Sequence, residues 1–246
     1  MNNLPSKEQE PTIKPGKAEG LPVFGNQMAG ELRGFGIIGI LAIVVIVLSG
    51  SIFIGNIIFP LGALLVLVWV RLSRTPWAAI GYVRPRRWLL SIAGGITLGI
   101  VFKLFMKSVV MPLLGAEPVN QAYHYLVGNN SMLPVAIWGM LMAGFGEETI
   151  FRGFLFERLG KLFGYGIWAR TAIIWLTSIV FGLGHYTTQG WTGVEHALIF
   201  GLLFGTIYSI TGRIFMLMVA HTVFDLTALA IIYWDLETEV AQFFFK

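Results

Sequence analysis

Cysteine and charge are both scarce in this sequence. None of the 246 residues is cysteine, which excludes disulfide bonds, thiolate metal sites and a cysteine nucleophile. Only 12% of the residues are charged and 56% are hydrophobic, whereas an ordinary globular protein has about 25% and about 45–50%. The mean hydropathy is +0.75, and several apolar runs approach the length that crosses a bilayer. We therefore expect an integral, polytopic membrane protein that contacts the lipid bilayer directly.

The basic character of the chain fits this class. The formal net charge is +4 and the isoelectric point is about 9.4. Such a value can indicate a nucleic-acid partner, but in a membrane protein lysine and arginine gather in the cytoplasmic connections. We interpret the excess as a topology signal and expect no nucleic-acid partner.

Hydropathy predicts an all-α bundle of about seven transmembrane helices. An eighth piece, re-entrant or interfacial, has room in the segment 112–133. The limits of each span are approximate because charged and turn residues blur them. The predicted spans are 35–54, 56–72, 88–111, 133–156, 167–185, 194–210 and 213–234.

Lysine and arginine alternate between the connections of this bundle. They occur in the N-terminal segment, after the second span, after the fourth span and in the turn before the seventh. The connections 112–133 and 186–193 contain neither, and the C-terminal end has only Lys246. Positive-inside sorting then predicts a cytoplasmic N-terminus and an external C-terminus, and we expect the plasma membrane as the location.

Hydropathy and charge together predict that the chain has four parts. Residues 1–34, which are polar and rich in glycine and proline, are expected to be a flexible cytoplasmic tail. Residues 35–111 form the N-terminal transmembrane helices. Residues 133–234 form a second transmembrane unit, which holds most of the ionisable residues found inside spans. Residues 235–246 are a C-terminal tail.

Few ionisable residues lie inside the spans of that second unit. Glu147 and Glu148 are near the middle of the fourth span, His185 ends the fifth, and His221 and Asp225 lie in the seventh. A carboxylate at the bilayer centre costs about 2.5–3.5 kcal/mol on insertion scales. These side chains must therefore face the bundle interior or a wet cavity, and they are the first candidates for a functional site.

The helical spacing of the acidic motif predicts different directions for its two glutamates. At about 100° per residue, Glu148 and Arg152 lie within about 40° of each other, whereas Glu147 is about 140° from Arg152. We expect a Glu148–Arg152 ion pair that orients the helix and leaves Glu147 to face a different neighbour. His221 and Asp225 have the same four-residue spacing, so they share one helix face.

Two carboxylates and two imidazoles from three helices suit general acid–base chemistry on water. A poorly solvated glutamate is a good base near neutral pH, and histidines can hold the water or donate to an oxyanion. The same residues could instead form a buried polar network that locks three helices together. They could also relay protons in a proton-coupled transporter. Residue types alone leave these three alternatives open.

Three short segments resemble the motifs of a known family. EETIFR, FGLGH and HTVFD are similar to the E-E-x-x-x-R, F-x-x-x-H and H-x-x-x-N/D motifs of the CPBP family. This is the family of CAAX proteases and bacteriocin-processing intramembrane proteases, and it includes the type II CAAX prenyl endopeptidases. The order, spacing and span placement agree over residues 133–234. The matching positions are Glu147, Glu148, Arg152, Phe181, His185, His221 and Asp225.

The resemblance implies a CAAX-type endopeptidase acting on membrane-associated protein or peptide tails. It implies that Glu147 activates the water, that His185 shares this water, and that His221 and Asp225 lie on the oxyanion side. Asp225 stands where the prenyl proteases more usually have asparagine. Because an ionised carboxylate cannot donate to an oxyanion, we expect Asp225 to orient His221 by accepting its N–H. The alternative is a non-proteolytic member of the same family, in bacteriocin self-immunity or membrane scaffolding, in which the motif persists as a binding or structural network.

The resemblance also raises the question of a metal. The family is commonly described as metalloproteases, and Glu147, His185 and His221 could supply three ligands to a Zn²⁺ ion that also binds water. A metal-free glutamate and histidine mechanism uses the same residues. We keep both mechanisms open.

Other residues have weaker signals. Lys103 and Lys107 lie four apart in the outer half of the third span, where they either snorkel to the headgroups, the interpretation we favour, or line a polar cavity. His196 begins the predicted sixth span and is expected to be a cap or an interface residue. Gly201 and Gly205 form a G-x-x-x-G pair, which predicts close helix packing.

Overall fold

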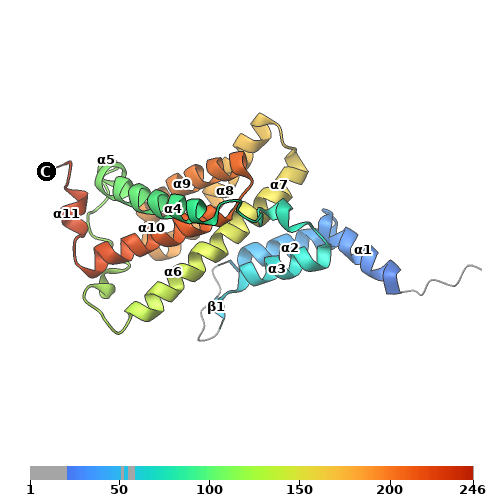
Figure 1. Cartoon of the computed structure of the whole chain (residues 1–246), viewed down its shortest axis with the longest axis horizontal. Helices are drawn as coiled ribbons and strands as arrows, with labels where there is room; N and C mark the ends of the chain where they lie inside the picture. Colours follow the sequence, from blue (N-terminus) through green and yellow to red (C-terminus); the bar gives the residue numbers. More distant parts are fainter. Residues whose placement is uncertain (1–20, 51–52, 55–58, 246) are drawn as a thin grey trace, which may run out of the picture.

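The computed structural model describes residues 21–50, 53–54 and 59–245. Within these ranges the fold is all-α except for one antiparallel pair of two-residue strands, β1 (Phe53–Ile54) and β2 (Phe59–Pro60). The helices form an elongated bundle, with α5 and α11 at one end and α1 and α7 at the other (Figure 1). The helices are α1 (Leu21–Arg33), α2 (Ile37–Leu48), α3 (Leu61–Ser73), α4 (Trp88–Phe105), α5 (Met111–Leu113), α6 (Leu133–Glu147), α7 (Phe156–Phe163), α8 (Ile167–Gly184), α9 (Tyr186–Thr211), α10 (Phe215–Tyr233) and α11 (Glu237–Ala241).

The number of spans differs from the prediction of seven. In the described part of the chain, four helices are long and apolar enough to cross a membrane: α4 with its extension to Leu113, α8, α9 and α10. A fifth span results if the pair formed by α1 and α2, bent by 61°, is counted as one. The chain is therefore a polytopic helical membrane protein with fewer complete spans than hydropathy alone predicted.

Two of the predicted spans do not form helices that are long and apolar enough to cross a membrane, each for a different physical reason. Helix α3 has 13 residues, about 20 Å at 1.5 Å per residue, against about 30 Å of hydrocarbon. The predicted span 133–156 lies in one continuous helical stretch from Leu133 to Phe163, but its charged residues interrupt the apolar run.

The outer surface of the bundle is apolar. Leu89 on α4 exposes 82% of its surface, and Val101, Phe105, Trp175 and Ile179 are exposed as well. Soluble proteins rarely display apolar surface on this scale, because it costs free energy in water. These side chains are suited to lipid, which agrees with an integral membrane protein.

Both predicted tails contain ordered structure. Residues 21–33, expected to be part of a flexible tail, form α1, and the preceding residues 1–20 lie outside the described residues. Helix α1 buries Ala29 and Leu32, and the Trp69 indole donates a 3.0 Å hydrogen bond to the Leu32 carbonyl. At the other end, α11 returns to the bundle and buries Glu237. Sequence polarity suggested tails because it does not show which polar residues find partners.

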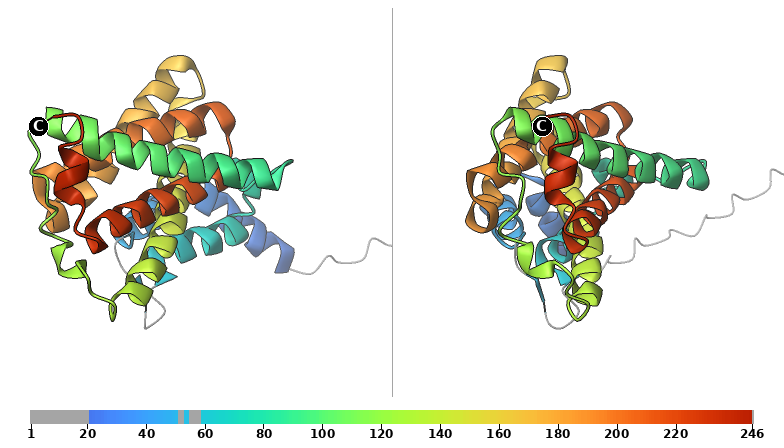
Figure 2. Two further views of the ribbon diagram at one scale, coloured as in Figure 1. Left: turned by 60° about the vertical axis from the view of Figure 1, so that its left-hand side comes forward. Right: turned by 90° about the vertical axis from the view of Figure 1, so that its left-hand side faces the viewer.

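Glycines allow the helices that carry the predicted site to pack closely. Helix α4 lies along α10 (Figure 2), and a Cβ at Gly99 would come within 2.5 Å of the Ala220 carbonyl oxygen. On α6, a Cβ at Gly144 would come within 2.4 Å of Thr222 Oγ1 on α10. A Cβ at Gly201 would meet Ser178 at 2.9 Å, so the close packing predicted there is confirmed, between α9 and α8.

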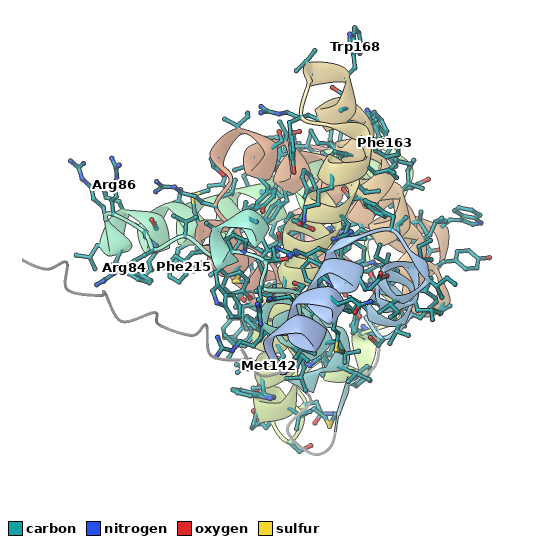
Figure 3. The ribbon with its side chains drawn as sticks, turned by 90° about the vertical axis from the view of Figure 1, so that its right-hand side faces the viewer. Arg84, Arg86, Met142, Phe163, Trp168 and Phe215 are labelled. Atoms are coloured by element: carbon teal, nitrogen blue, oxygen red, sulfur yellow. The ribbon has the colours of Figure 1, made fainter. Side chains whose placement is uncertain are left out.

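The segments that connect the helices lie at two different ends of the bundle. Arg84 and Arg86 project beyond the start of α4, and Trp168 projects from the start of α8 (Figure 3). The end that holds α5 and α11 also holds the segment 114–132 (Figure 1). The arginine-rich loop and the segment without lysine or arginine therefore lie at different ends, as the predicted topology requires.

Candidate active site

The acidic motif lies where the helix geometry changes. Helix α6 ends at Glu147, and a π-helical segment, Glu148–Leu155, follows before α7. π-Helical turns are frequent at functional sites, because their i→i+5 bonding redirects side chains relative to an α-helix. Angles calculated for a regular α-helix therefore do not hold across this junction.

Glu148 is the buried centre of the site. Its side chain is fully inaccessible, and its Oε1 accepts a 2.9 Å hydrogen bond from Arg152 Nη1. The predicted ion pair is confirmed. The same oxygen lies 2.8 Å from His221 Nδ1 on α10. Because a carboxylate can only accept, Nδ1 carries the proton, and Glu148 fixes both the orientation of the imidazole and its Nδ1–H.

The other imidazole nitrogen faces two more carboxylates. His221 Nε2 lies 3.5 Å from Glu147 Oε2 and 3.6 Å from Asp225 Oδ2. Both distances exceed that of a direct hydrogen bond and are in the range that a bridging water serves. Glu147 and Asp225 expose 27% and 26% of their side chains, so water can reach them.

Two predicted relationships differ from this geometry. Glu147 was expected to face a different neighbour from Glu148, but the two glutamates approach opposite nitrogens of the same ring. Asp225 was expected to orient His221 by accepting its N–H. The carboxylate in hydrogen-bond distance of the ring is Glu148, whereas Asp225 shares Nε2 with Glu147. The spacing within each helix could not reveal which side chain on α6 meets α10.

Aromatic rings enclose the buried part of the site. The Arg152 guanidinium lies 4.9 Å from the centroid of the Phe181 ring and 5.6 Å from those of Phe200 and Phe204. Phe200 also packs 4.5 Å from the His221 ring. Apolar walls of this kind lower the local dielectric and strengthen the interactions among the charged groups inside.

His185 belongs to the same region, although it follows the last residue of α8. Its Nδ1 donates a 2.9 Å hydrogen bond to the Phe181 carbonyl. Because Nδ1 carries this proton, Nε2 is left to act elsewhere. The Phe181 ring packs 4.7 Å from the His185 ring and 6.2 Å from the His221 ring, so it lies next to both imidazoles. His185 and His221 both line one cavity.

This cavity has a volume of about 660 Å³. It reaches from His221 and His185 to the segment 115–123 and to α11. Three polar residues on its wall, Lys103, Tyr123 and Gln189, were not among the predicted site residues. The only sequence signal was the position of Lys103 inside a span.

Tyr123 brings a neutral hydroxyl to the cavity wall. It lies in the connection between α5 and α6, and Gln189 Nε2 is 3.4 Å from its hydroxyl oxygen. Burial, together with the negative charges of Asp225 and Glu147, raises the pKa of the Tyr123 hydroxyl above its ordinary value. The group therefore stays protonated and able to donate throughout the physiological pH range.

The predicted zinc ligands do not meet as a ligand set. Zinc needs its nitrogen and oxygen donors at about 2.0–2.2 Å from one point. Among the described residues, no three histidine, aspartate or glutamate side chains converge closely enough for that. Zinc bound by Glu147, His185 and His221 stays a prediction, and we derive no catalytic step through a metal.

Comparison with known proteins agrees with the motifs. Residues 129–227 match the family described as Type II CAAX prenyl endopeptidase Rce1-like. The matched segment contains all three motifs and runs from just before α6 into α10. No curated protein and no solved structure matches the chain.

Proposed function

We propose that this protein is an intramembrane endopeptidase, because residues 129–227 form a domain of the Rce1-like type II CAAX prenyl endopeptidase family. Its substrates are membrane-associated protein or peptide tails. One observation carries the proposal: Glu148 holds His221 by Nδ1, and Nε2 faces the partly exposed Glu147 and Asp225. A network that only locked helices together would use both ring nitrogens in direct hydrogen bonds.

In the proposed reaction Glu147 is the general base. It accepts a proton from a water molecule while the water oxygen attacks the scissile carbonyl carbon and the carbonyl electrons move to oxygen. As imidazoliums that keep their Nδ1–H on Glu148 and on the Phe181 carbonyl, His221 and His185 can donate Nε2–H to the resulting oxyanion. General-base assistance of this kind contributes about 10²–10⁴-fold to a rate.

Collapse of the tetrahedral intermediate completes the hydrolysis. The carbon–nitrogen bond breaks, and Glu147 returns the proton to the leaving nitrogen, so the products are one carboxylic acid and one amine. Asp225 lies 3.6 Å from His221 Nε2, a distance at which a bridging water can link its carboxylate to the N–H of a His221 imidazolium. We assign Asp225 the role of holding this proton near the oxyanion.

The position of the cavity bears on the substrate. Its wall includes Gly115–Tyr123, in the segment predicted to be external from the absence of lysine and arginine. With a cytoplasmic N-terminus in the plasma membrane, the cavity opens toward the outer side. This favours peptide tails presented at the outer leaflet over cytoplasmic prenylated proteins.

The proposal is tested with purified wild-type protein and the Glu147→Gln variant in detergent. Both are incubated with a quenched farnesyl-CAAX peptide and with a mixed set of membrane-tethered peptides, and products are identified by mass spectrometry. Cleavage by the wild type that falls at least about 100-fold in the variant is expected. The exposed Glu239→Gln serves as the matched control and should cleave normally.

Other outcomes would replace the proposal. A wild type that folds but cleaves none of the peptides would favour a non-proteolytic role in self-immunity or scaffolding. Proton-dependent solute uptake that is abolished by Glu147→Gln would identify a transporter.

A further inference from the structure

The polar groups near α11 belong to the cavity of the candidate active site. Lys107 Nζ forms a 2.8 Å ion pair with the buried Glu237, and Lys103 is buried with its Nζ 4.7 Å from the centroid of the Phe224 ring. Neither lysine snorkels to the headgroups, so the interpretation that we favoured is wrong. His196 lies inside α9 and is no cap, and its ring packs 5.5 Å from Phe224, at the interface with α10. The opposite end of the bundle has a cavity of its own.

This second cavity, of about 420 Å³, lies at the end of the bundle that holds α1 and α7 (Figure 1). Its wall brings together three basic side chains from three helices: Arg33 of α1, Lys161 of α7 and Arg170 of α8. All three residues are exposed, so their cations are accessible from outside the bundle. Lysine and arginine gather in cytoplasmic connections, so this end is predicted to face the cytoplasm.

The second cavity has a surplus of positive charge. Glu157 contributes a carboxylate to its wall, but that carboxylate is buried and already forms ion pairs with Lys161 and, at 3.4 Å, with Arg158. The guanidinium groups of Arg33 and Arg170 have no carboxylate partner among the residues that the structure describes. Two cations are therefore free to bind an anion that enters the cavity.

Tyr208 of α9 adds an unused hydroxyl to the same wall. The residue exposes 7% of its surface, and its ring packs edge-on against Phe156 at 5.0 Å. Its hydroxyl has no hydrogen-bond partner within the described part of the chain. A largely buried hydroxyl without a partner costs free energy, so this group is suited to a ligand that carries oxygen acceptors.

Apolar side chains lie next to the basic ones on the turn between α7 and α8. Trp168 exposes 84% of its surface, Ile167 72% and Tyr165 62%, and all three lie between Lys161 and Arg170 in the chain. Trp168 projects outward at this turn (Figure 3). Exposed tryptophan and tyrosine are typical of the headgroup level of a bilayer. A site for a soluble anion would not need this apolar surface beside it.

We propose that the second cavity binds the headgroup of an anionic phospholipid, with Arg33 and Arg170 on its phosphate and Tyr208 donating to a phosphate oxygen. A phosphate diester has one negative charge and two free oxygens, which planar guanidinium groups match. Anionic lipids are enriched in the cytoplasmic leaflet, and basic pockets between helices on that side bind their headgroups. The site is separate from the proposed peptidase centre and does not depend on its activity.

The test compares two lipids that differ in headgroup charge. Delipidated protein in detergent is titrated with phosphatidylglycerol or phosphatidylcholine of the same acyl chains, and bound lipids are counted by native mass spectrometry. The variants are Arg33→Gln, Arg170→Gln, the double variant and Tyr208→Phe. Arg84→Gln removes an exposed arginine that does not line the cavity, so it is the matched control. Thermal unfolding verifies that each variant folds.

We expect the wild type to bind one phosphatidylglycerol about 30-fold more tightly than phosphatidylcholine, because each cation near an anionic lipid contributes about 5-fold. Each single arginine variant should lose about 5-fold of this preference, the double variant nearly all of it, and Arg84→Gln none. Tyr208→Phe should weaken both lipids by about 2- to 10-fold and keep the preference, because both headgroups have phosphate oxygens.

Equal affinity of the wild type for the two lipids, or a preference that the double variant keeps, would overturn the inference. Displacement of phosphatidylglycerol by inorganic phosphate or glycerol phosphate at equal concentration would also overturn it, in favour of a soluble phosphorylated ligand. Peptide cleavage is measured on the same preparations. A wild type that selects phosphatidylglycerol and cleaves no peptide would keep the lipid site and refute the endopeptidase function.

Discussion

Glu148 Oε1 lies 2.8 Å from His221 Nδ1, a hydrogen bond between residues 73 positions apart. The same oxygen accepts a hydrogen bond from Arg152 at 2.9 Å. One buried carboxylate therefore compensates the guanidinium and also decides which nitrogen of the imidazole faces Glu147 and Asp225. In this arrangement the second glutamate of the motif is as important for the chemistry as the first.

This arrangement predicts different costs for the single and double changes at Glu148 and Arg152. Glu148→Gln or Arg152→Met alone leaves one buried charge without its partner, which typically costs about 3–5 kcal/mol of folding free energy. Together, the two changes should cost less than either change alone. Cleavage should stay reduced in the double variant, because a neutral amide oxygen accepts the His221 Nδ1–H more weakly than a carboxylate does. Thermal unfolding in detergent and peptide cleavage measure the two effects, and a double variant that regains cleavage would contradict the orienting role.

Asp225 is predicted to tolerate asparagine better than alanine. An asparagine amide keeps the shape and can donate directly to an oxyanion, whereas alanine removes the group beside His221 Nε2. We expect Asp225→Asn to cleave within about 10-fold of the wild type and Asp225→Ala to lose about 100-fold or more. Equal loss in both variants would show that the negative charge itself is required.

Gly144 is predicted to set the distance between the glutamates and His221. A Cβ there would lie 2.4 Å from Thr222 Oγ1 and 2.8 Å from the Thr222 backbone nitrogen, so Gly144→Ala must push α6 away from α10. We expect a loss of about 1–3 kcal/mol in stability and reduced cleavage. Gly139 on the same helix has nothing within 4 Å of a Cβ, so Gly139→Ala is the matched control. It should be neutral or stabilising by about 0.5–1 kcal/mol.

Chelation is predicted to leave cleavage intact. Glu147, His185 and His221 do not converge as a ligand set in the described structure, and the proposed mechanism needs only Glu147 and the histidines. Activity should survive dialysis against EDTA and 1,10-phenanthroline, with metal content followed by mass spectrometry. Inactivation that zinc reverses would establish the metalloprotease alternative.

The topology is testable because the chain contains no cysteine. Gln121→Cys lies in the predicted external segment and Arg84→Cys in the arginine-rich loop, and both positions are exposed. A membrane-impermeant maleimide added to intact cells should label Gln121→Cys, and Arg84→Cys should react only after permeabilisation. The reverse pattern would place the cavity on the cytoplasmic side and favour cytoplasmic substrates.

Much of this protein was determined by the sequence alone. The high apolar content required a helical membrane protein, since only closed hydrogen-bonded structures satisfy the backbone in lipid. Three motifs of fixed spacing identified Glu147, His185 and His221 as candidates, because ionisable residues survive inside spans only where they have a use or a partner. The Glu148–Arg152 pair was predicted from a local spacing of four residues, and local spacing is visible in a sequence.

Only the tertiary structure decided which residues meet across helices. Glu147 and Glu148, at the junction of α6 with the π-helical segment, both face the imidazole of His221, and contacts of that kind depend on packing against α10. The close approaches at Gly99 and Gly144 brought α4 and α6 onto α10, which placed Lys103 beside Phe224 and the glutamates beside His221. Contacts between residues distant in sequence depend on side-chain shape in three dimensions. Hydropathy and periodicity indicate only which side of its helix each residue faces.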